Sequence, residues 1–140
     1  MLGASLLGGG CADDPVKELE EHRQEWLAKH PQDYVVEICG TGLSCCCSLN
    51  AVSGGQVVAS RSKLRGQDYK DGPIAGEPIA TLFDQVAREV SSDNCDLEAL
   101  QFDAKYSYVS DYYCSSGEEG GGAKVTCFQP DTTDLTACSP

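Results

Sequence analysis

Nine cysteines are the residues of this sequence with the most distinctive chemistry, because a thiol can be lipidated, oxidised to a disulfide or bound to a metal. A reducing cytosol gives a chain of 140 residues little reason to keep so many thiols, so their number indicates an oxidising compartment. The odd count also requires one cysteine to differ from the rest. The nine are Cys11, Cys39, Cys45, Cys46, Cys47, Cys95, Cys114, Cys127 and Cys138.

Cys11 follows an uncharged leader of small and apolar residues, and the sequence turns abruptly polar after it. This order resembles the end of a bacterial lipoprotein signal peptide, in which a peptidase cuts before the cysteine and its thiol receives diacylglycerol. We therefore expect residues 1–11 to be a residual signal peptide, with Cys11 as the lipidated first residue of the mature chain. The apolar stretch is too short for a transmembrane span, which needs about 20 residues. An ordinary cysteine behind a glycine-rich leader is the alternative.

The eight other cysteines form an even set that could close four disulfides. Cys45, Cys46 and Cys47 are adjacent and Cys39 is near them, which also suits a thiolate site for zinc or copper. On a strand, however, Cys45 and Cys47 point to one side and Cys46 to the other, so three thiolates would converge only in an irregular loop. We therefore expect disulfides and no metal or cofactor, with thiolate metal binding as the alternative.

Residues typical of catalytic sites are scarce in this sequence. His22 lies on the polar flank of a predicted helix and His30 at its end, where a histidine is commonly a favourable cap. No serine lies in a nucleophile elbow, and the adjacent cysteines precede a predicted strand rather than the helix that activates a redox dithiol. The sequence therefore predicts a protein that is not an enzyme.

The charge of the chain restricts its partners. Lys and Arg total 10 against 22 Asp and Glu, giving a formal net charge of -12, and the basic residues form no cluster. Polyanions are repelled by such a surface, so we expect no nucleic-acid partner and no membrane contact beyond the lipid anchor. With 41% hydrophobic and 23% charged residues, we expect residues 12–140 to form a single folded domain with a flexible C-terminal tail.

Two helices are predicted, over residues 15–29 and 78–91. Asp14 and Pro15 suit the N-cap and first position of the first helix. Apolar residues recur at helical spacing in both segments. In the first these residues are Val16, Leu19, Trp26 and Leu27, and in the second Ile79, Leu82, Phe83, Val86 and Val90.

Six strands are predicted, over residues 34–39, 45–52, 56–61, 97–102, 108–114 and 123–128. Glycines at 54 and 55 predict a tight turn between the second and third. The element order α-β-β-β-α-β-β-β looks like a duplicated unit, although the halves share no matching residues. The simplest packing is a two-layer α+β domain, with both helices on one face of a mainly antiparallel sheet of about five to six strands.

Four tyrosines, at 106, 108, 112 and 113, could form a recognition patch, because tyrosine offers apolar area together with a hydroxyl. Tyr106, Tyr108 and Tyr112 share one strand parity and Tyr113 has the other. One set is expected to pack under a helix and the other to be exposed, so at least one of Tyr112 and Tyr113 is predicted to be clearly exposed. Core packing of all four is the alternative.

Several short motifs occur in an order that resembles a known family. They are Trp26, Asp33 and Tyr34, the cysteines at 45–47, Gly55 to Val57, Thr81 to Asp84, and Leu100 to Asp103 leading to Tyr106. Over residues 17–114 the chain is similar to a bacterial envelope lipoprotein family catalogued as domain of unknown function 6174. The resemblance implies an architecture and an envelope location, without a chemistry. The chain departs from it at residues 107–109, where relatives have a proline-containing turn, and in the extra cysteines Cys95, Cys114, Cys127 and Cys138.

The sequence therefore predicts a non-catalytic, secreted or envelope-anchored lipoprotein that binds or supports an extracytoplasmic protein or other envelope component. The alternative function is a thiolate metal-binding protein that uses Cys39 and the cysteines at 45–47.

Overall fold

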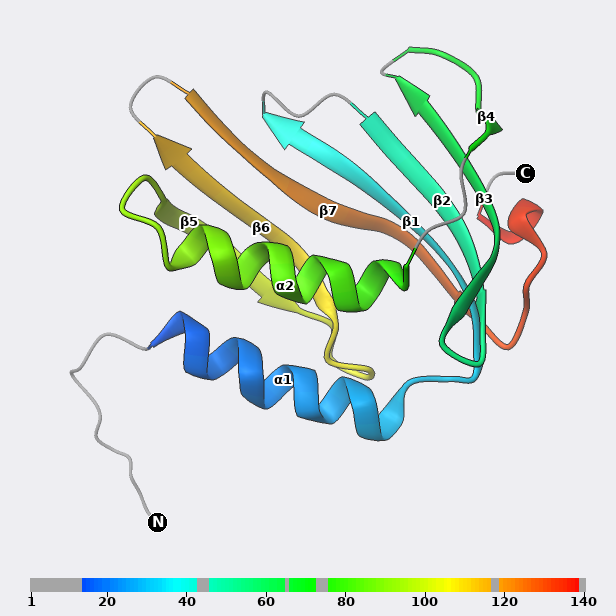
Figure 1. The fold of residues 1–140 in the computed structure, drawn as a ribbon, viewed down its shortest axis with the longest axis horizontal. Helices are drawn as coiled ribbons and strands as arrows, with labels where there is room; N and C mark the ends of the chain where they lie inside the picture. Colours follow the sequence, from blue (N-terminus) through cyan, green and yellow to red (C-terminus); the bar gives the residue numbers. More distant parts are fainter. Residues whose placement is uncertain (1–13, 43–45, 65, 73–75, 117–118, 139–140) are drawn as a thin grey trace.

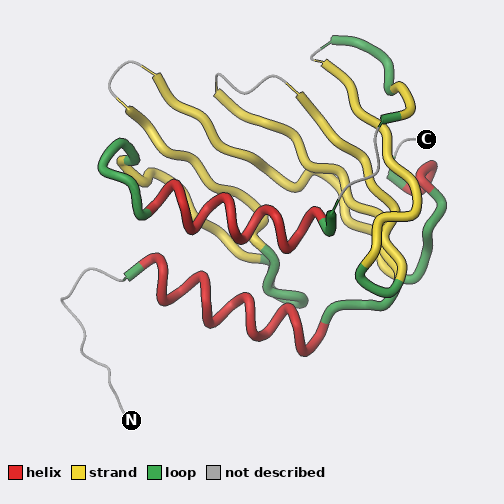
Figure 2. The backbone as a smooth tube through the Cα atoms, in the orientation of Figure 1, coloured by secondary structure: helices red, strands yellow, loops and turns green. Residues whose placement is uncertain are grey.

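The computed structural model describes residues 14–42, 46–64, 66–72, 76–116 and 119–138. Two helices lie on one side of a seven-stranded antiparallel sheet, which confirms the predicted α+β class (Figures 1 and 2). The helices are α1 (Pro15–Lys29) and α2 (Pro78–Val90), followed near the C-terminus by the short 3₁₀ helix η1 (Leu135–Ala137). The strands are β1 (Asp33–Gly42), β2 (Cys46–Ser53), β3 (Gln56–Leu64), β4 (Lys70–Asp71), β5 (Asp96–Phe102), β6 (Val109–Ser116) and β7 (Glu119–Pro130).

The sheet has one strand more than the five to six predicted. Its order is β4-β3-β2-β1-β7-β6-β5, and the additional strand is β4, which pairs with Arg61 and Ser62 of β3. Two residues are too few to show the alternation by which a strand is recognised in a sequence. The predicted turn between β2 and β3 is confirmed, since Gly54 and Gly55 have φ of 59° and 79°, as a two-residue hairpin turn requires.

The two halves of the chain meet where β1 pairs with β7. Each half is a helix followed by consecutive antiparallel strands, and the β1–β7 register runs from Tyr34 opposite Pro130 to Gly42 opposite Gly121. In the first half the strand after the helix is central in the sheet, whereas in the second half it is the edge strand β5. The repeated order of elements therefore does not produce a repeated unit.

Helix α1 begins at the predicted residue, but fewer of its apolar side chains are buried than predicted. The Asp14 carboxylate accepts a hydrogen bond from the Val16 amide at 3.0 Å and caps the helix. Leu19 and Trp26 are buried, but the side chains of Val16 and Leu27 are 42% and 58% exposed, so the apolar stripe is narrower than the sequence indicated. A helix with two buried apolar side chains needs further contacts to stay on the sheet.

Helix α2 is the more strongly buried helix. Glu77 is its N-cap, and the Glu77 carboxylate accepts hydrogen bonds from the amides of Ile79 and Ala80 and from the Tyr34 hydroxyl of β1. The helix start is thereby tied to the centre of the sheet. Four apolar side chains at helical spacing are buried beneath it, as predicted, namely Ile79, Leu82, Phe83 and Val86.

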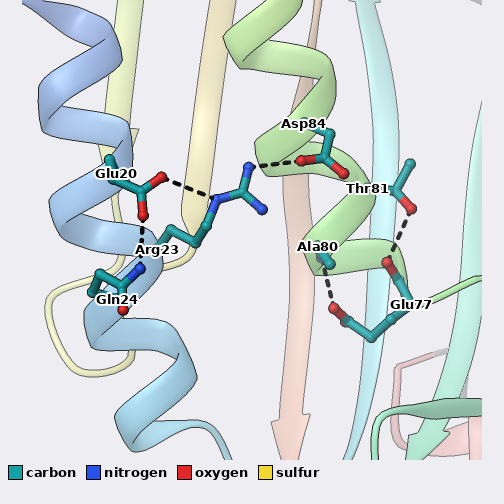
Figure 3. Close-up of polar contacts among 7 residues, drawn as sticks. All are labelled: Glu20, Arg23, Gln24, Glu77, Ala80, Thr81 and Asp84. Carbon is teal, nitrogen blue, oxygen red and sulfur yellow. Dashed lines mark hydrogen bonds and ion pairs between the residues drawn. The ribbon is translucent and has the colours of Figure 1, made fainter.

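An ion pair joins the two helices at their exposed edge. The Arg23 guanidinium lies 2.7 Å from an Asp84 carboxylate oxygen and 3.7 Å from Glu20, and it sits over the Phe83 ring (Figure 3). Because Asp84 and Glu20 are largely solvated, each pair contributes at most about 1 kcal/mol. The stacking of Arg23 on Phe83 orients the guanidinium for both carboxylates.

The core beneath the helices includes an aromatic cluster around the partly buried Phe128. Its ring centroid is 4.7 Å from that of Tyr108 and 5.2 Å from that of Tyr34, and both contacts are stacked. Trp26 approaches Tyr34, Tyr108 and Phe128 edge-on at 5.5 to 6.0 Å. These side chains come from α1, β1, β7 and the segment before β6, so aromatic packing fastens both halves of the chain together.

The opposite face of the sheet has a smaller core of its own. Leu135 of η1 packs there with Val35, Leu49 and Ala51. A disulfide from Cys127 of β7 to Cys138 holds this segment in place. Residues up to 138 are thus fastened to the sheet, where the sequence suggested a flexible tail.

The prediction of disulfides is confirmed for the described cysteines. Besides the bridge between Cys127 and Cys138, the structure has bridges between Cys39 and Cys47 and between Cys95 and Cys114, and Cys46 is disulfide-bonded as well. Cys11 and Cys45 lie outside the described residues. Disulfides form and persist in oxidising compartments, which indicates an extracytoplasmic setting.

Replacing both Cys127 and Cys138 with alanine should lower the free energy of unfolding by about 3 kcal/mol, because the bridge closes a short loop in the unfolded chain. Chemical denaturation followed by circular dichroism measures this change. The protection of the Leu135 amide against hydrogen exchange should fall in the same variant. An unchanged denaturation midpoint would contradict the role assigned to this bridge.

Candidate ligand-binding cleft

One part of the helix-facing side of the sheet has no helix over it. Seven strands span about 29 Å, whereas two helices side by side cover about 20 Å. The uncovered part belongs to β2 and β3, on the far side of α2 from α1 (Figure 1). A cleft of about 370 Å³ lies between α2 and these strands. The residues that line it are Ile38, Ser48, Asn50, Ser60, Ser62, Gly72, Pro78, Thr81, Leu82, Gln85 and Ala123.

The floor of the cleft is a block of four polar side chains. The hairpin register places Ser48 directly opposite Ser62 and Asn50 directly opposite Ser60. Along each strand the two polar residues are two positions apart, so all four side chains point to the same face. Farther along β2, the same face becomes apolar at Val52, which belongs to the core under the helices. The change from apolar to polar residues coincides with the edge of helix coverage.

The wall of the cleft is the flank of α2. Thr81 and Gln85 are four positions apart and therefore lie one above the other on the helix surface. Leu82, Ile38 and Ala123 close the inner end of the cleft with apolar surface. The site thus combines a hydrogen-bonding floor and wall with an apolar end, as small-molecule sites commonly do.

A hydrogen-bonded chain fixes the orientation of Gln85. The Tyr112 hydroxyl donates to a Glu89 carboxylate oxygen at 2.6 Å, and Gln85 Nε2 donates to the Tyr112 oxygen at 2.6 Å. A carboxylate can only accept, so the phenol is the donor to Glu89 and the acceptor from Gln85. Burial, assisted by the Glu89 carboxylate, raises the pKa of Tyr112 well above its ordinary value, which keeps this phenol protonated.

The described lining of the cleft is uncharged. Among the described residues that line it, none carries an ionisable side chain. Its chemistry is therefore hydrogen bonding by hydroxyl and carboxamide groups rather than ion pairing. Such groups recognise and orient a ligand.

The four tyrosines do not form the exposed patch that the sequence suggested. Tyr108 and Tyr112 are buried, and Tyr106 packs against the same core from its edge, 5.4 Å from the Phe128 ring centroid. The predicted difference in parity is confirmed, since Tyr113 is on the other face. There it is partly buried rather than clearly exposed.

Glycines explain the position of Tyr113. A Cβ atom built at Gly120 would lie 2.3 Å from the Tyr113 hydroxyl oxygen, and one at Gly42 would lie 2.9 Å from its ring. The Tyr113 ring therefore rests on bare backbone of β7 and β1. Its packing on the protein leaves it little area to present to a partner.

The histidines have structural contacts. His22 was expected on a polar flank, but its ring stacks on Phe102 of β5 with centroids 3.7 Å apart and 7° between the planes. This contact supplements the narrow apolar stripe of α1. His30 is the C-cap of α1, and its ring stacks on Trp26 at 5.1 Å.

Two of the cysteines predicted as metal ligands, Cys39 and Cys47, are bonded to each other. Cys39 and Cys47 face each other directly across β1 and β2, and their sulfurs are bonded at 2.01 Å. In this oxidised state neither sulfur is a thiolate that could bind zinc or copper. The metal-binding alternative therefore requires prior reduction of this bridge.

Sequence reasoning missed the cleft residues, although a signal for them was present. The turn at Gly54 and Gly55 fixes the hairpin register approximately, and that register pairs serines of the two strands. Along such a hairpin the residues on one face change from apolar to polar. This change indicates the point at which that face is no longer covered by the core. What the sequence could not show is which face the helices cover.

Comparison of the chain with protein-family models, with curated proteins and with solved structures found no match. The resemblance to the envelope lipoprotein family therefore stays a prediction. None of the helices in the described part of the chain is long and apolar enough to cross a membrane. The cleft between α2, β2 and β3 is the candidate site that its geometry supports best.

The stability of the fold should fall steeply above pH 10. Burial raises the pKa of Tyr34, Tyr69, Tyr108 and Tyr112 above the ordinary value of 10.0. The folded state then holds more protons than the unfolded state above that pH, so the stabilisation is complete below pH 10 and is lost as the pH rises. The slope is at most about 1.4 kcal/mol per pH unit for each tyrosine.

The measurement is denaturant unfolding between pH 8 and 12, with tyrosinate absorbance recorded in parallel. Tyr112→Phe should reduce the slope above pH 10, because it removes one of the four groups. Equal slopes in the variant and the original protein would show that Tyr112 ionises as readily in the folded state as in the unfolded state.

Proposed function

We propose that the protein is a non-catalytic, lipid-anchored binding domain of the cell envelope, and that the cleft between α2 and the β2–β3 hairpin is its ligand site. The observation that carries this proposal is the cleft without charged residues in its described lining, whose floor has four paired polar side chains, the buried Asn50 and three serines that are partly or fully exposed. Where the helices cover this face of the sheet its side chains are apolar, whereas beside α2 the same face is polar and concave.

The lipid anchor is part of the same proposal. The sequence places Cys11 behind an apolar leader and three residues before the N-cap Asp14. So short a spacer would hold the N-terminal end of α1 close to a bilayer. The disulfides support an extracytoplasmic location, which is where lipoproteins are processed.

The thiolate metal-binding function is the second candidate, and it depends on the redox state. The same protein would have to bind zinc or copper stoichiometrically after reduction, through Cys39 and its neighbours. Metal content measured before and after mild reduction decides between the two candidates, because the binding domain proposed here needs no metal in either state.

Ser48→Leu should abolish ligand binding in the cleft while leaving the fold intact. Ser48 lies between Ile38 and Ser62 in the sheet, so a leucine there would fill the floor and could pack on Ile38. The measurement is a nuclear magnetic resonance screen of small neutral, acidic and basic fragments, read from backbone amide shifts. Neutral fragments should shift cleft amides in the original protein and not in Ser48→Leu.

The matched control for this screen is Ser115→Leu. Ser115 is a partly exposed strand serine of β6 on the opposite face of the sheet, so the same substitution there should leave fragment binding unchanged. A screen in which no fragment shifts the cleft amides, or in which Ser48→Leu binds as well as the original protein, would refute the cleft as the ligand site.

Cys11→Ser should move the natively expressed protein from the detergent phase to the aqueous phase in a phase-partition experiment. The physical reason is that two acyl chains anchor a protein stably, at about 0.8 kcal/mol per buried methylene, and a serine at this position has no thiol to carry them. Mass spectrometry of the original protein should show a chain beginning at Cys11 with added diacylglycerol. An intact, unmodified leader on protein from a lipoprotein-processing host would contradict the anchor.

A further inference from the structure

We infer that the ligand of the cleft is a neutral saccharide, recognised through hydroxyl groups that can both donate and accept hydrogen bonds. This inference rests on the proposed function, since it assigns a chemical class to the ligand of the same site. It follows from which donors in the cleft are already used within the protein and which acceptors are left over.

Three lining residues donate hydrogens within the protein, namely the single hydroxyl hydrogens of Thr81 and Ser60 and one of the two amide hydrogens of Gln85. The Thr81 hydroxyl donates to the backbone oxygen of Glu77 at 3.0 Å, and the Ser60 hydroxyl donates to Asn50 Oδ1 at 2.9 Å. Gln85 Nε2 donates to Tyr112, as described above. Each of the three keeps an oxygen that can accept, namely Thr81 Oγ1, Ser60 Oγ and Gln85 Oε1.

The donors that remain are the Nδ2 group of Asn50 and the second amide hydrogen of Gln85, and two further hydroxyls can either donate or accept. Asn50 accepts through Oδ1, so its Nδ2 is the group that it can offer as a donor. Ser48 and Ser62 form no side-chain hydrogen bond to another residue in the described part of the chain, so each hydroxyl can donate or accept. A complementary ligand must therefore bring several closely spaced donors and at least one acceptor.

Charged ligands fit this arrangement poorly. A carboxylate or phosphate has no hydrogens for the three accepting oxygens, and the formal net charge of -12 repels anions. An ammonium ion could donate to them, but the described lining contains no carboxylate to compensate for its desolvation. A neutral polyol satisfies the donor requirement without that penalty.

The apolar end and the size of the cleft favour a saccharide among polyols. Leu82, Ile38 and Ala123 can pack against the C–H face of a sugar ring while the ring hydroxyls face Thr81 and Gln85. The volume of about 370 Å³ is at the lower end of the range for small-molecule sites, which suits one or two sugar rings.

The test is a titration of the oxidised, folded protein with saccharides, followed by backbone amide shifts. The probes are glucose, N-acetylglucosamine, maltose and N,N′-diacetylchitobiose, with glucosamine and glucuronate as cationic and anionic counterparts. At least one neutral saccharide should shift amides of β2, β3 and α2, and its affinity should exceed that of its charged counterpart by tenfold or more.

Two variants identify the groups responsible. Thr81→Val removes an accepting oxygen from the wall, and Ser62→Ala removes a floor hydroxyl that has no partner among the described side chains, so both proteins should remain folded. Each should weaken saccharide binding about fivefold to tenfold. Thr133→Val, at an exposed position beyond β7, is the matched control and should bind as the original protein does.

The outcomes separate this inference from the proposed function. If cleft amides respond to glucosamine and not to the neutral sugars, or to fragments and not to any saccharide, the assigned class is wrong while the cleft remains the ligand site. If neither fragments nor saccharides shift the cleft amides, both proposals fail. Saccharide shifts that persist unchanged in Thr81→Val and Ser62→Ala would also overturn the inference.

Discussion

The pairing of β1 with β7 is the contact on which the rest of the structure depends. It joins two halves of the chain that are each a helix with a set of consecutive strands. Among the strands that the structure describes, it is the one pairing between strands that are not consecutive in sequence. Different side chains cover the two faces of this strand pair. Phe128 and Tyr34 form an aromatic cluster with Trp26 under the helices, and Val35 packs with Leu135 on the other side. Without this seam, neither half could bury the apolar face of its own helix.

A consequence of joining the halves edge to edge is that the sheet becomes wider than its helix layer. Seven strands exceed the width of two helices by about 10 Å. The excess falls on the β2–β3 hairpin because α2 packs on β6 and Trp26 of α1 contacts Phe128 of β7. The sequence matches this geometry. On the helix-facing side of β2, the residues change from the apolar Val52 to the polar Asn50 and Ser48 where the helices no longer cover the sheet. The cleft is therefore a product of the topology and not of a loop added to the fold.

Two buried tyrosines set the distance between α2 and the sheet, and thereby the width of the cleft. Tyr34 donates to Glu77 at the start of the helix, and Tyr112 donates to Glu89 in its last turn. Both phenols remain protonated because burial raises their pKa, so both ties are donor-to-carboxylate bonds, which are stronger than bonds between neutral groups. Gln85 links these hydrogen bonds to the cleft. Because its Nε2 donates to Tyr112, the orientation of its side-chain amide toward a ligand is fixed.

The sequence alone determined the local structure of this protein. Asp14 and Pro15 specified the start of α1, the spacing of Ile79, Leu82, Phe83 and Val86 specified α2, and alternation located six of the seven strands, because these signals act between neighbours in the chain. The number of cysteines likewise indicated disulfides and an oxidising compartment.

Only the tertiary structure decided which local faces meet. It put Tyr108 and Tyr112 in the core, because a strand has two faces and the sequence does not say which one a helix covers. It stacked His22 on Phe102, a contact between residues 80 positions apart that no local pattern encodes. It also left the serines of β2 and β3 outside the area that the helices cover, because the extent of that area follows from the β1–β7 pairing. The alternation of residues within a strand does not specify which distant strand it pairs with.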